Sequence, residues 1–119
     1  MVEGLDHVQL AMPRGGEEWS RAYFAGLLGL AELEKPPALA GRGGVWFALA
    51  DGRQLHLGVE EPFRASGKAH PAFGCGDLDA LARRLAEGGY AVRWAGELAP
   101  RRRFYEEDPF GNRVEFIGS

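Results

Sequence analysis

The order of predicted secondary-structure elements repeats once along this chain, and the repeat restricts the possible folds more than any single motif does. Alternation of apolar and polar residues predicts a strand from Leu5 to Met12, and helical spacing predicts an amphipathic helix from Glu17 to Leu28. The helix would place on one face Trp19, Ala22, Tyr23, Gly26 and Leu27. Three further strands are predicted at residues 30–34, 45–50 and 53–60. The segment 38–44 between them reads as a loop of small residues.

The second half of the chain has the same plan. A strand is predicted at residues 70–75, and Asp77 is a typical N-cap for the helix that follows. The apolar stripe of that helix contains Leu78, Leu81, Ala82 and Leu85. Another strand is predicted at residues 90–94, and residues 104–117 read as two strands joined by a tight turn. Turn residues occupy equivalent places in both halves, at Asp51 and Gly52 and again from Pro109 to Asn112.

The repeat predicts a fold of the α+β class. At 119 residues the chain has the length of a single domain that can bury a core without disulfides. Residues 1–60 and 69–119 each read as a βαβββ module, and residues 61–68 between them have the composition of a linker. We therefore expect one domain, 1–119, made of two modules. Two half-domains that share one core are the alternative.

The repeat also aligns the histidines of the chain with one carboxylate. When the two turns are set in register, His56 falls opposite Glu115, and when the opening strands are set in register, His7 falls opposite His70. All three histidines therefore occupy repeat-equivalent positions. Three imidazoles and a carboxylate are a competent ligand set for a divalent metal ion, Zn, Ni, Fe, Mn or Co.

Purely structural roles are the alternative for the same residues. A single histidine on a strand is usually a hydrogen-bonded structural residue, and Glu115 could be the partner of Arg113 or Arg53. Arg103, with its two neighbouring arginines, could hold an anionic substrate or lie on a solvated loop. Trp46 and Tyr105 could line a ligand pocket or belong to the core.

Composition argues against nucleic acid and membranes as partners of the chain. The formal net charge is −3, which gives no reason to expect nucleic acid as a partner. The single cysteine, Cys75, cannot form an internal disulfide and reads as a small buried residue. The first residues lack the pattern of a signal peptide, and no apolar run is long enough to span a membrane. We expect a cytoplasmic protein without a membrane partner.

Five segments of the chain resemble the vicinal oxygen chelate superfamily, which includes glyoxalase I, extradiol dioxygenases, fosfomycin-resistance enzymes and bleomycin-resistance proteins. These segments are residues 5–10, 22–30, 70–73, 77–81 and 104–116. The most specific of them is the last, in which a turn of the form D-P-x-G-N precedes the strand that carries Glu115. The resemblance implies paired βαβββ modules that form a curved, half-barrel mixed sheet with the helices on its outer face. It also implies a homodimer.

By position, the resemblance implies that His7, His56, His70 and Glu115 are metal ligands, with Glu115 also able to shuttle a proton. Glyoxalase I has a carboxylate or an amide where this chain has His56, so the ligand set departs from that enzyme. The implied activity is that of a metal-dependent lyase, isomerase or dioxygenase, which chelates two adjacent oxygens of a small oxygenated metabolite. Arg103, Tyr105 and Trp46 are then candidates to contact the substrate. A metal-free small-molecule binding protein of the bleomycin-resistance type is the alternative.

Overall fold

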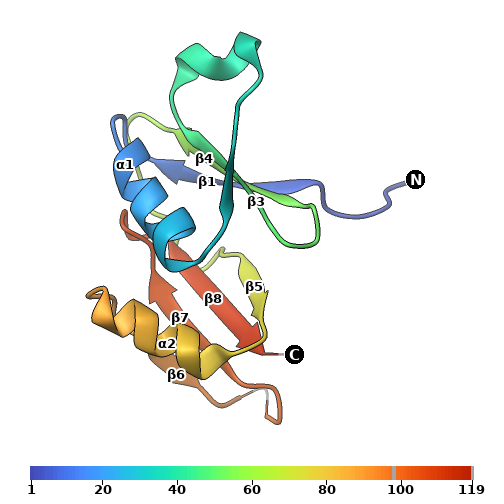
Figure 1. Ribbon diagram of the computed structural model, residues 1–119, viewed down its shortest axis with the longest axis vertical. Coiled ribbons are helices and arrows are strands. Elements are labelled where there is room, and N and C mark those ends of the chain that lie inside the picture. The colour runs from blue at the N-terminus through green and yellow to red at the C-terminus, as the bar shows by residue number, and fades with distance from the viewer. Residues whose placement is uncertain (98, 119) are drawn as a thin grey trace. The chain divides into compact units, whose positions relative to one another are not determined.

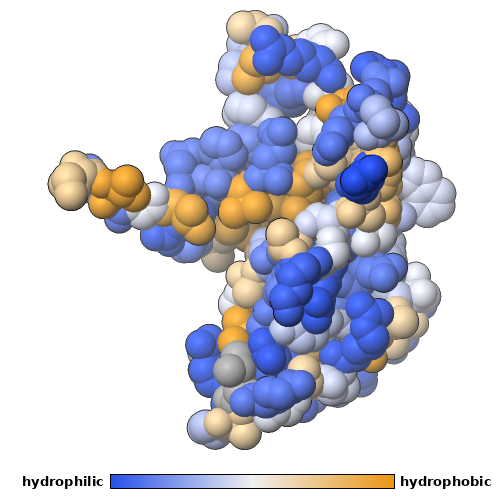
Figure 2. Space-filling model, turned by 180° about the vertical axis from the view of Figure 1, so that it is seen from behind, coloured by the Kyte–Doolittle hydropathy of each residue, from blue (hydrophilic) through white to orange (hydrophobic). Residues whose placement is uncertain are grey.

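The computed structural model describes residues 1–97 and 99–118, and it divides the chain into two compact units, Met1–Ala65 and Ser66–Ser119 (Figure 1). Each unit is described on its own below. The described residues include no helix that is both long and apolar enough to cross a membrane. Met1, Val2 and Leu5 are exposed on the extended arm that precedes the first strand, and this arm is visible as an apolar projection in Figure 2.

The first unit contains a four-stranded mixed sheet with the strand order β1-β4-β3-β2. Its elements, in chain order, are β1 His7–Met12, α1 Glu17–Ser20, η1 Arg21–Leu27, β2 Ala31–Leu33, η2 Pro37–Arg42, β3 Val45–Ala48 and β4 Gln54–Val59. Strand β1 pairs with β4 in parallel, and the other two pairings are antiparallel. The segment expected to be a plain loop at 38–44 therefore contains a short 3-10 helix, η2, for which Pro37 is a suitable first residue.

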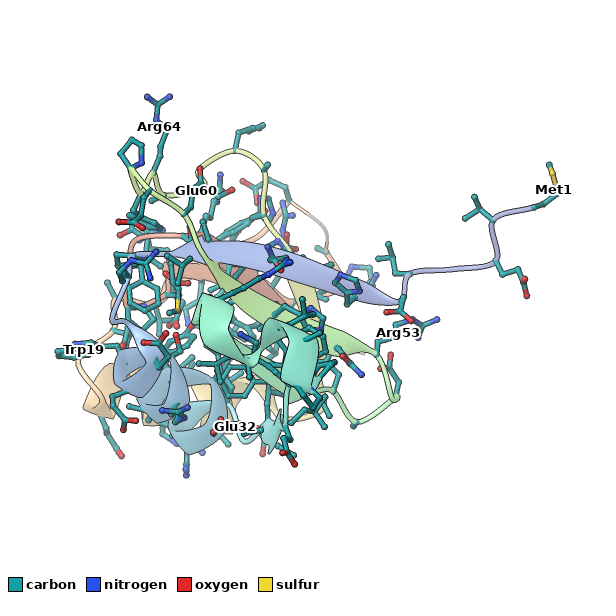
Figure 3. All side chains as sticks on the ribbon, turned by 90° about the horizontal axis from the view of Figure 1, so that it is seen from above. Met1, Trp19, Glu32, Arg53, Glu60 and Arg64 are labelled. Carbon is teal, nitrogen blue, oxygen red and sulfur yellow. The ribbon has the colours of Figure 1, made fainter. Side chains whose placement is uncertain are left out.

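The helix predicted at residues 17–28 is present, but its buried face differs from the expectation. After α1 the helix widens into η1, where the N–H of Leu28 donates to the carbonyl of Tyr23, five residues earlier. Tyr23 and the adjacent Phe24 are both buried, and η1 contacts β2 and β3. Trp19, predicted on the apolar face, is 67 % exposed and projects outward from α1 (Figure 3). The buried residues Gly16, Ser20, Tyr23 and Phe24 follow the usual helical period, so the predicted stripe was wrong in its position around the helix and not in its period.

The second unit repeats the same topology. Its elements are β5 Ala72–Cys75, α2 Leu78–Glu87, β6 Arg93–Ala95, β7 Arg103–Glu107 and β8 Arg113–Gly118, with the strand order β5-β8-β7-β6. Strands β5 and β8 are parallel, and the remaining pairs are antiparallel. The strand expected at 90–94 is shorter and lies later in the chain, at β6. His70 lies two residues before β5 rather than inside the strand.

Helix α2 confirms the predicted cap and the predicted apolar stripe. The carboxylate of Asp77 accepts a hydrogen bond of 3.0 Å from the N–H of Ala80, which satisfies one of the free donors at the start of the helix. Leu78, Ala82 and Leu85 are buried, and the helix contacts β8. The burial of this stripe fixes which face of the sheet α2 covers.

The turn between β7 and β8 is held by Asp108 and Asn112. The Asp108 carboxylate accepts hydrogen bonds from the backbone N–H groups of Phe110 and Asn112, each 2.9 Å long, and from the Asn112 side chain. The side-chain oxygen of Asn112 accepts from the N–H of Ser66 at 2.9 Å. Gly111 has a φ of 93°, a conformation that favours glycine. This turn sets the register of β7 against β8 and so places Glu115.

Both sheets are open and mixed, and helices are few. These features confirm the predicted α+β fold made of two βαβββ units. The pairing registers also agree with the alignment of the two halves. Gln9 pairs with His56 in the first unit, and Ala72 pairs with Glu115 in the second. Because His7 and His70 each lie two residues before those partners, the repeat-equivalent positions inferred from the sequence are equivalent in the structure.

Candidate functional site

His7 and His56 lie on the same face of the first sheet, on adjacent parallel strands. Their rings stack with centroids 4.2 Å apart and planes 18° apart. On its other face, the His56 ring stacks on the indole of Trp46, with centroids 3.9 Å apart and planes 1° apart. Trp46 is the cross-strand partner of His56 in the antiparallel pair of β3 and β4. The three side chains therefore form one continuous stack of rings.

His56 is held inside this ring stack by its surroundings. It is 4 % exposed, and its Nε2 lies 2.8 Å from Oε1 of Gln54. Burial, followed by the proximity of His7, lowers the pKa of His56 below its ordinary value. A lowered pKa favours the neutral imidazole near neutral pH, which is the form that binds metal ions.

His7 is oriented by the residue before it. Its Nδ1 lies 2.9 Å from a carboxylate oxygen of Asp6, and its side chain is 44 % exposed. Among the described residues, Nε2 of His7 has no hydrogen-bond partner. A carboxylate on one ring nitrogen is the arrangement that prepares the other nitrogen as a metal ligand.

The ring stack limits how His7 and His56 could share an ion. Two ligand atoms that bind one ion at about 2.1 Å, at roughly a right angle, lie only about 3.0 Å apart. The two stacked rings are 4.2 Å apart and nearly parallel, so their nitrogens do not converge. Binding of one ion by both histidines therefore requires one of the two rings to turn.

His70 and Glu115 meet in the second unit. Nδ1 of His70 lies 2.8 Å from the carbonyl oxygen of Lys68, and Nε2 lies 3.0 Å from Oε1 of Glu115. A carbonyl oxygen can only accept, so Nδ1 carries the proton in that contact. In the neutral ring Nε2 is then a bare acceptor that faces a carboxylate. That contact is favourable only when Nε2 binds a second proton or when a cation takes both atoms as ligands.

The donor set of the second unit suits a divalent metal ion. Two ligand atoms with bonds of about 2.1 Å lie about 3.0 Å apart at a right angle and about 3.4 Å apart at a tetrahedral angle, so the 3.0 Å between Nε2 of His70 and Oε1 of Glu115 fits adjacent ligands of an octahedral ion. The N–H of His70 on a backbone carbonyl is a common outer contact of metal-binding histidines. Within either unit, no cluster of three or more His, Cys, Asp or Glu side chains suited to a metal ion occurs among the residues that the structure describes. Each unit thus offers one pair of candidate ligands.

Glu115 is a buried carboxylate that contacts both His70 and Arg103. Its side chain is 7 % exposed, and its Oε2 accepts a contact of 3.4 Å from Nη1 of Arg103. Burial is the largest single influence and by itself would raise the pKa of Glu115. The hydrogen bonds from His70 and Arg103, together with the charges of these groups, outweigh burial and lower the pKa below its ordinary value. Glu115 is therefore ionised at neutral pH.

Aromatic and basic side chains surround this carboxylate. Tyr105 is the cross-strand partner of Glu115, and its ring meets that of His70 edge to face, with centroids 5.4 Å apart. The guanidinium carbon atoms of Arg103 and Arg113 lie 5.2 Å and 4.1 Å from the centre of the Tyr105 ring. Tyr105 thus occupies in the second unit the place that Trp46 has in the first.

Some of these contacts were not foreseen from the sequence. Within the second unit Glu115 pairs with Arg103, whereas Arg113 lies over the Tyr105 ring. In the first unit Arg53 pairs with Asp51. The contacts of Asp6 with His7 and of Gln54 with His56 were also missed. Strand alternation was a usable signal for Arg103, because residues 103 and 105 share a face of β7 and residue 105 pairs with Glu115.

The match to a family model covers residues 4–116, which is nearly the whole chain, and its description is the Glyoxalase/Bleomycin resistance protein/Dioxygenase superfamily. The chain belongs to this superfamily. Among solved structures, a protein from Bacillus anthracis described as a member of the glyoxalase family is 39 % identical. It matches 100 % of this chain and 97 % of its own, with a TM-score of 0.95. The comparison with curated proteins found no match.

More distant structures show that this glyoxalase-superfamily fold is shared with proteins of different kinds. The fosfomycin resistance protein FosX from Listeria monocytogenes is 16 % identical over 100 % of this chain and 95 % of its own, with a TM-score of 0.79. TnmS3, an antibiotic binding protein from Streptomyces, is 20 % identical over 98 % and 96 % of the two chains, with a TM-score of 0.78. At these identities the likeness concerns the fold alone.

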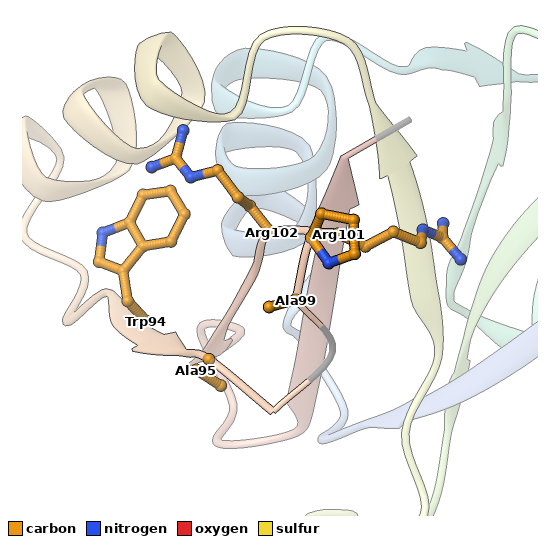
Figure 4. A pocket seen from close by; sticks show the side chains of 7 residues that line it. Trp94, Ala95, Ala99, Arg101 and Arg102 are labelled. Carbon is orange, nitrogen blue, oxygen red and sulfur yellow. The ribbon is translucent and has the colours of Figure 1, made fainter.

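A cavity of about 340 Å³ lies elsewhere in the second unit of this superfamily member, between β6 and β7. It is lined by Trp94, Ala95, Gly96, Ala99, Pro100, Arg101 and Arg102 (Figure 4). The guanidinium of Arg102 lies 4.5 Å from the centre of the Trp94 ring. Arg101 and Arg102, the two neighbours of Arg103 that were considered with it as anion-binding residues, line this cavity. Arg103, Tyr105, Trp46 and the four candidate metal ligands are not among its lining residues.

Acidification should destabilise the fold through His56. Because burial lowers the pKa of His56 in the folded state, the unfolded chain binds the proton first. The free energy of unfolding should therefore fall as the pH drops below about 6.5, the ordinary histidine pKa, until the folded pKa is reached. Urea unfolding between about pH 5 and pH 8, in the presence of a chelator, measures this effect.

His56→Phe is the matched variant for this measurement, since it keeps a flat ring between Trp46 and His7 but does not titrate. The variant should lose less stability than the unchanged chain over the same pH range. Parallel pH profiles for the two proteins would show that His56 titrates alike in the folded and unfolded states.

Proposed function

We propose that this protein is a metal-dependent enzyme of the glyoxalase and dioxygenase type, a lyase, isomerase or dioxygenase that acts on a small oxygenated metabolite. The observation that carries the proposal is the His70 and Glu115 pair. With Nδ1 of His70 donating to Lys68, the remaining ring nitrogen and the carboxylate oxygen lie 3.0 Å apart, and in the neutral ring both atoms are acceptors. A divalent cation bound to both atoms would make their close approach favourable.

The proposed ligand set is His7, His56, His70 and Glu115, two from each unit. The pairs that share an ion come from one chain or from the two chains of a homodimer, which is the assembly we propose for this protein. His7 has a ring nitrogen prepared for binding by Asp6. His56 must leave its stack with Trp46 to take part, so we expect it to be the weaker ligand. The donor types suit Zn, Ni, Fe, Mn or Co.

A metal bound at these residues would supply Lewis-acid stabilisation of the negative charge that develops on a substrate held through two adjacent oxygens. The residues of this chain would transfer the proton and contact the substrate. The low pKa of Glu115 keeps the carboxylate ionised, so it can accept a proton from the substrate carbon or hydroxyl next to it. Arg103 and Tyr105 lie next to that carboxylate and would contact the substrate. Trp46 would offer the same kind of contact in the first unit.

Elemental analysis tests the proposal directly. Protein purified without chelators and without a metal-affinity tag should contain a divalent metal in a stoichiometric amount. Chelation should remove it, and the stripped protein should take up an added ion again. Protein that contains no stoichiometric metal and binds none of the five candidate ions would contradict the metal-dependent function.

A second candidate function is metal-free binding of a small organic molecule. It is supported by the likeness in fold to TnmS3, which is named as an antibiotic binding protein. The half-buried Trp46, whose ring stacks on His56, offers flat aromatic surface of the kind that organic ligands contact. Binding of a flat aromatic compound that quenches Trp46 fluorescence and persists in excess chelator would favour this function.

A further inference from the structure

Arg103 has an unusually loose set of contacts for a guanidinium in this position. Its side chain is 17 % exposed, and its two ion-pair distances are 3.4 Å to Glu115 and 3.5 Å to Glu97. Both lie beyond the usual range of about 2.7–3.2 Å for such hydrogen bonds. Its Nε is buried without a hydrogen-bond partner among the described residues. Charge, rather than a closed set of hydrogen bonds, holds this guanidinium in place.

The neighbouring Arg102, by contrast, forms two hydrogen bonds of normal length to a single carboxylate. Its Nη1 and Nη2 each donate a bond of 2.9 Å to the carboxylate of Asp79, and its guanidinium also lies over Trp94. Two parallel bonds to one carboxylate are the arrangement that a guanidinium prefers. Arg103 does not have this arrangement. The edge of its guanidinium formed by Nε and Nη2 has only the contact to Glu97, whose side chain is 74 % exposed.

Glu115 needs a positive charge, but not necessarily that of Arg103. A carboxylate that is 7 % exposed is stable only when it is paired, and in this structure Arg103 supplies the positive charge beside it. A divalent ion bound to Glu115 would supply the same neutralisation more strongly. It would also repel the guanidinium, because the two cations would share one carboxylate. The guanidinium would then be free to pair with another anion.

We propose that Arg103 is an exchangeable counter-ion, which neutralises Glu115 when no metal is bound and presents its fork to an oxyanion when a metal takes the carboxylate. Metal and anion then bind with positive linkage, each strengthening the other. This inference rests on the proposed metal site and narrows its substrate class. The substrate carries a carboxylate, phosphate or phosphonate group beside the two oxygens that are chelated, since a planar fork matches such groups.

The test measures Co²⁺ binding by the metal-stripped protein, by calorimetry and by the visible absorption of the bound ion, with and without sulfate at constant ionic strength. In the unchanged chain, sulfate should tighten Co²⁺ binding about fivefold or more. Arg103→Met should bind Co²⁺ several-fold more tightly without sulfate, because the competing cation is gone, and should lose the response to sulfate. Arg103→Lys keeps the charge without the fork, so it should retain the weaker Co²⁺ binding but respond little to sulfate.

Arg102→Met is the matched control, because Arg102 is fully engaged by Asp79, and it should respond to sulfate as the unchanged chain does. Two results would overturn the exchange: no effect of sulfate on the unchanged chain, or an equal effect on the unchanged chain and on Arg103→Met. Failure of the unchanged chain to bind Co²⁺ at all is a different result. It would overturn the metal site itself, and the linkage with it.

Discussion

Replacement of His70 by alanine should lower the affinity for a divalent metal ion by more than about 100-fold. Loss of a residue that merely supports a ligand already costs about 10- to 100-fold, and His70 is proposed as a ligand itself. The variant leaves Glu115 buried without its contact to Nε2, so the second unit loses half of its ligand pair. Calorimetric titration of the metal-stripped protein with Zn²⁺ measures the change.

His56→Phe is the comparison variant for this measurement. It preserves the ring stack with Trp46 and His7, and His56 must break that stack in order to bind an ion. The loss of affinity in His56→Phe should therefore be smaller than the loss in His70→Ala. Unchanged metal content in His70→Ala would remove that residue from the site. Circular dichroism of both variants would separate loss of a ligand from loss of the fold.

Replacement of Asp108 by alanine should destabilise the second unit by about 3 kcal/mol or more, the sum expected when several donors in a buried turn lose one shared acceptor. The carboxylate is 4 % exposed and accepts from the N–H groups of Phe110 and Asn112 and from the Asn112 side chain. Asn112 is fully buried, so water cannot replace the lost acceptor. Urea unfolding at neutral pH measures the change in the free energy of unfolding.

Asp51→Ala is the matched control, because Asp51 belongs to the equivalent turn of the first unit but is exposed. Its carboxylate accepts from the N–H and the side chain of Arg53, both at the surface. The cost of Asp51→Ala should stay below about 1 kcal/mol, the usual range for exposed polar contacts. Equal effects of the two substitutions would mean that burial of the Asp108 turn does not contribute to its strength.

Local patterns in the sequence were sufficient for most of the fold. Strand alternation located both halves of the repeat, and the N-cap at Asp77 and the turn before β8 were recognised from residue types that have few other uses. These signals depend on neighbours within a few residues, so they survive without tertiary information. The division into one domain of two modules with a linker at 61–68 stays a prediction.

The helix of the first unit shows where such local reasoning stops. Its extent was predicted, but the wider turn at η1 was not, and the predicted apolar face failed at Trp19. The buried face is the side that carries Ser20, Tyr23 and Phe24, and it is fixed by the contacts of η1 with β2 and β3, which lie far from it in the sequence.

For the candidate site too, the sequence was sufficient to select the residues but not to show how their side chains are oriented. Alignment of the repeat, from sequence alone, selected His7, His56, His70 and Glu115, and the strand registers show that these positions are equivalent. That result needed only the order of residues along paired strands. Their roles as metal ligands stay a prediction.

What only the tertiary structure decided is the direction in which each polar group points. It showed that His70 donates to Lys68 and turns its bare nitrogen to Glu115, whereas His56 is stacked against Trp46 and His7. It also made Arg103 the loose partner of Glu115 and Arg102 the tight partner of Asp79. Adjacent residues with the same side chain thus have different roles. The physical reason is that hydrogen-bond and ring geometry depends on side-chain rotamers and on residues far away in the chain, which a linear pattern does not encode.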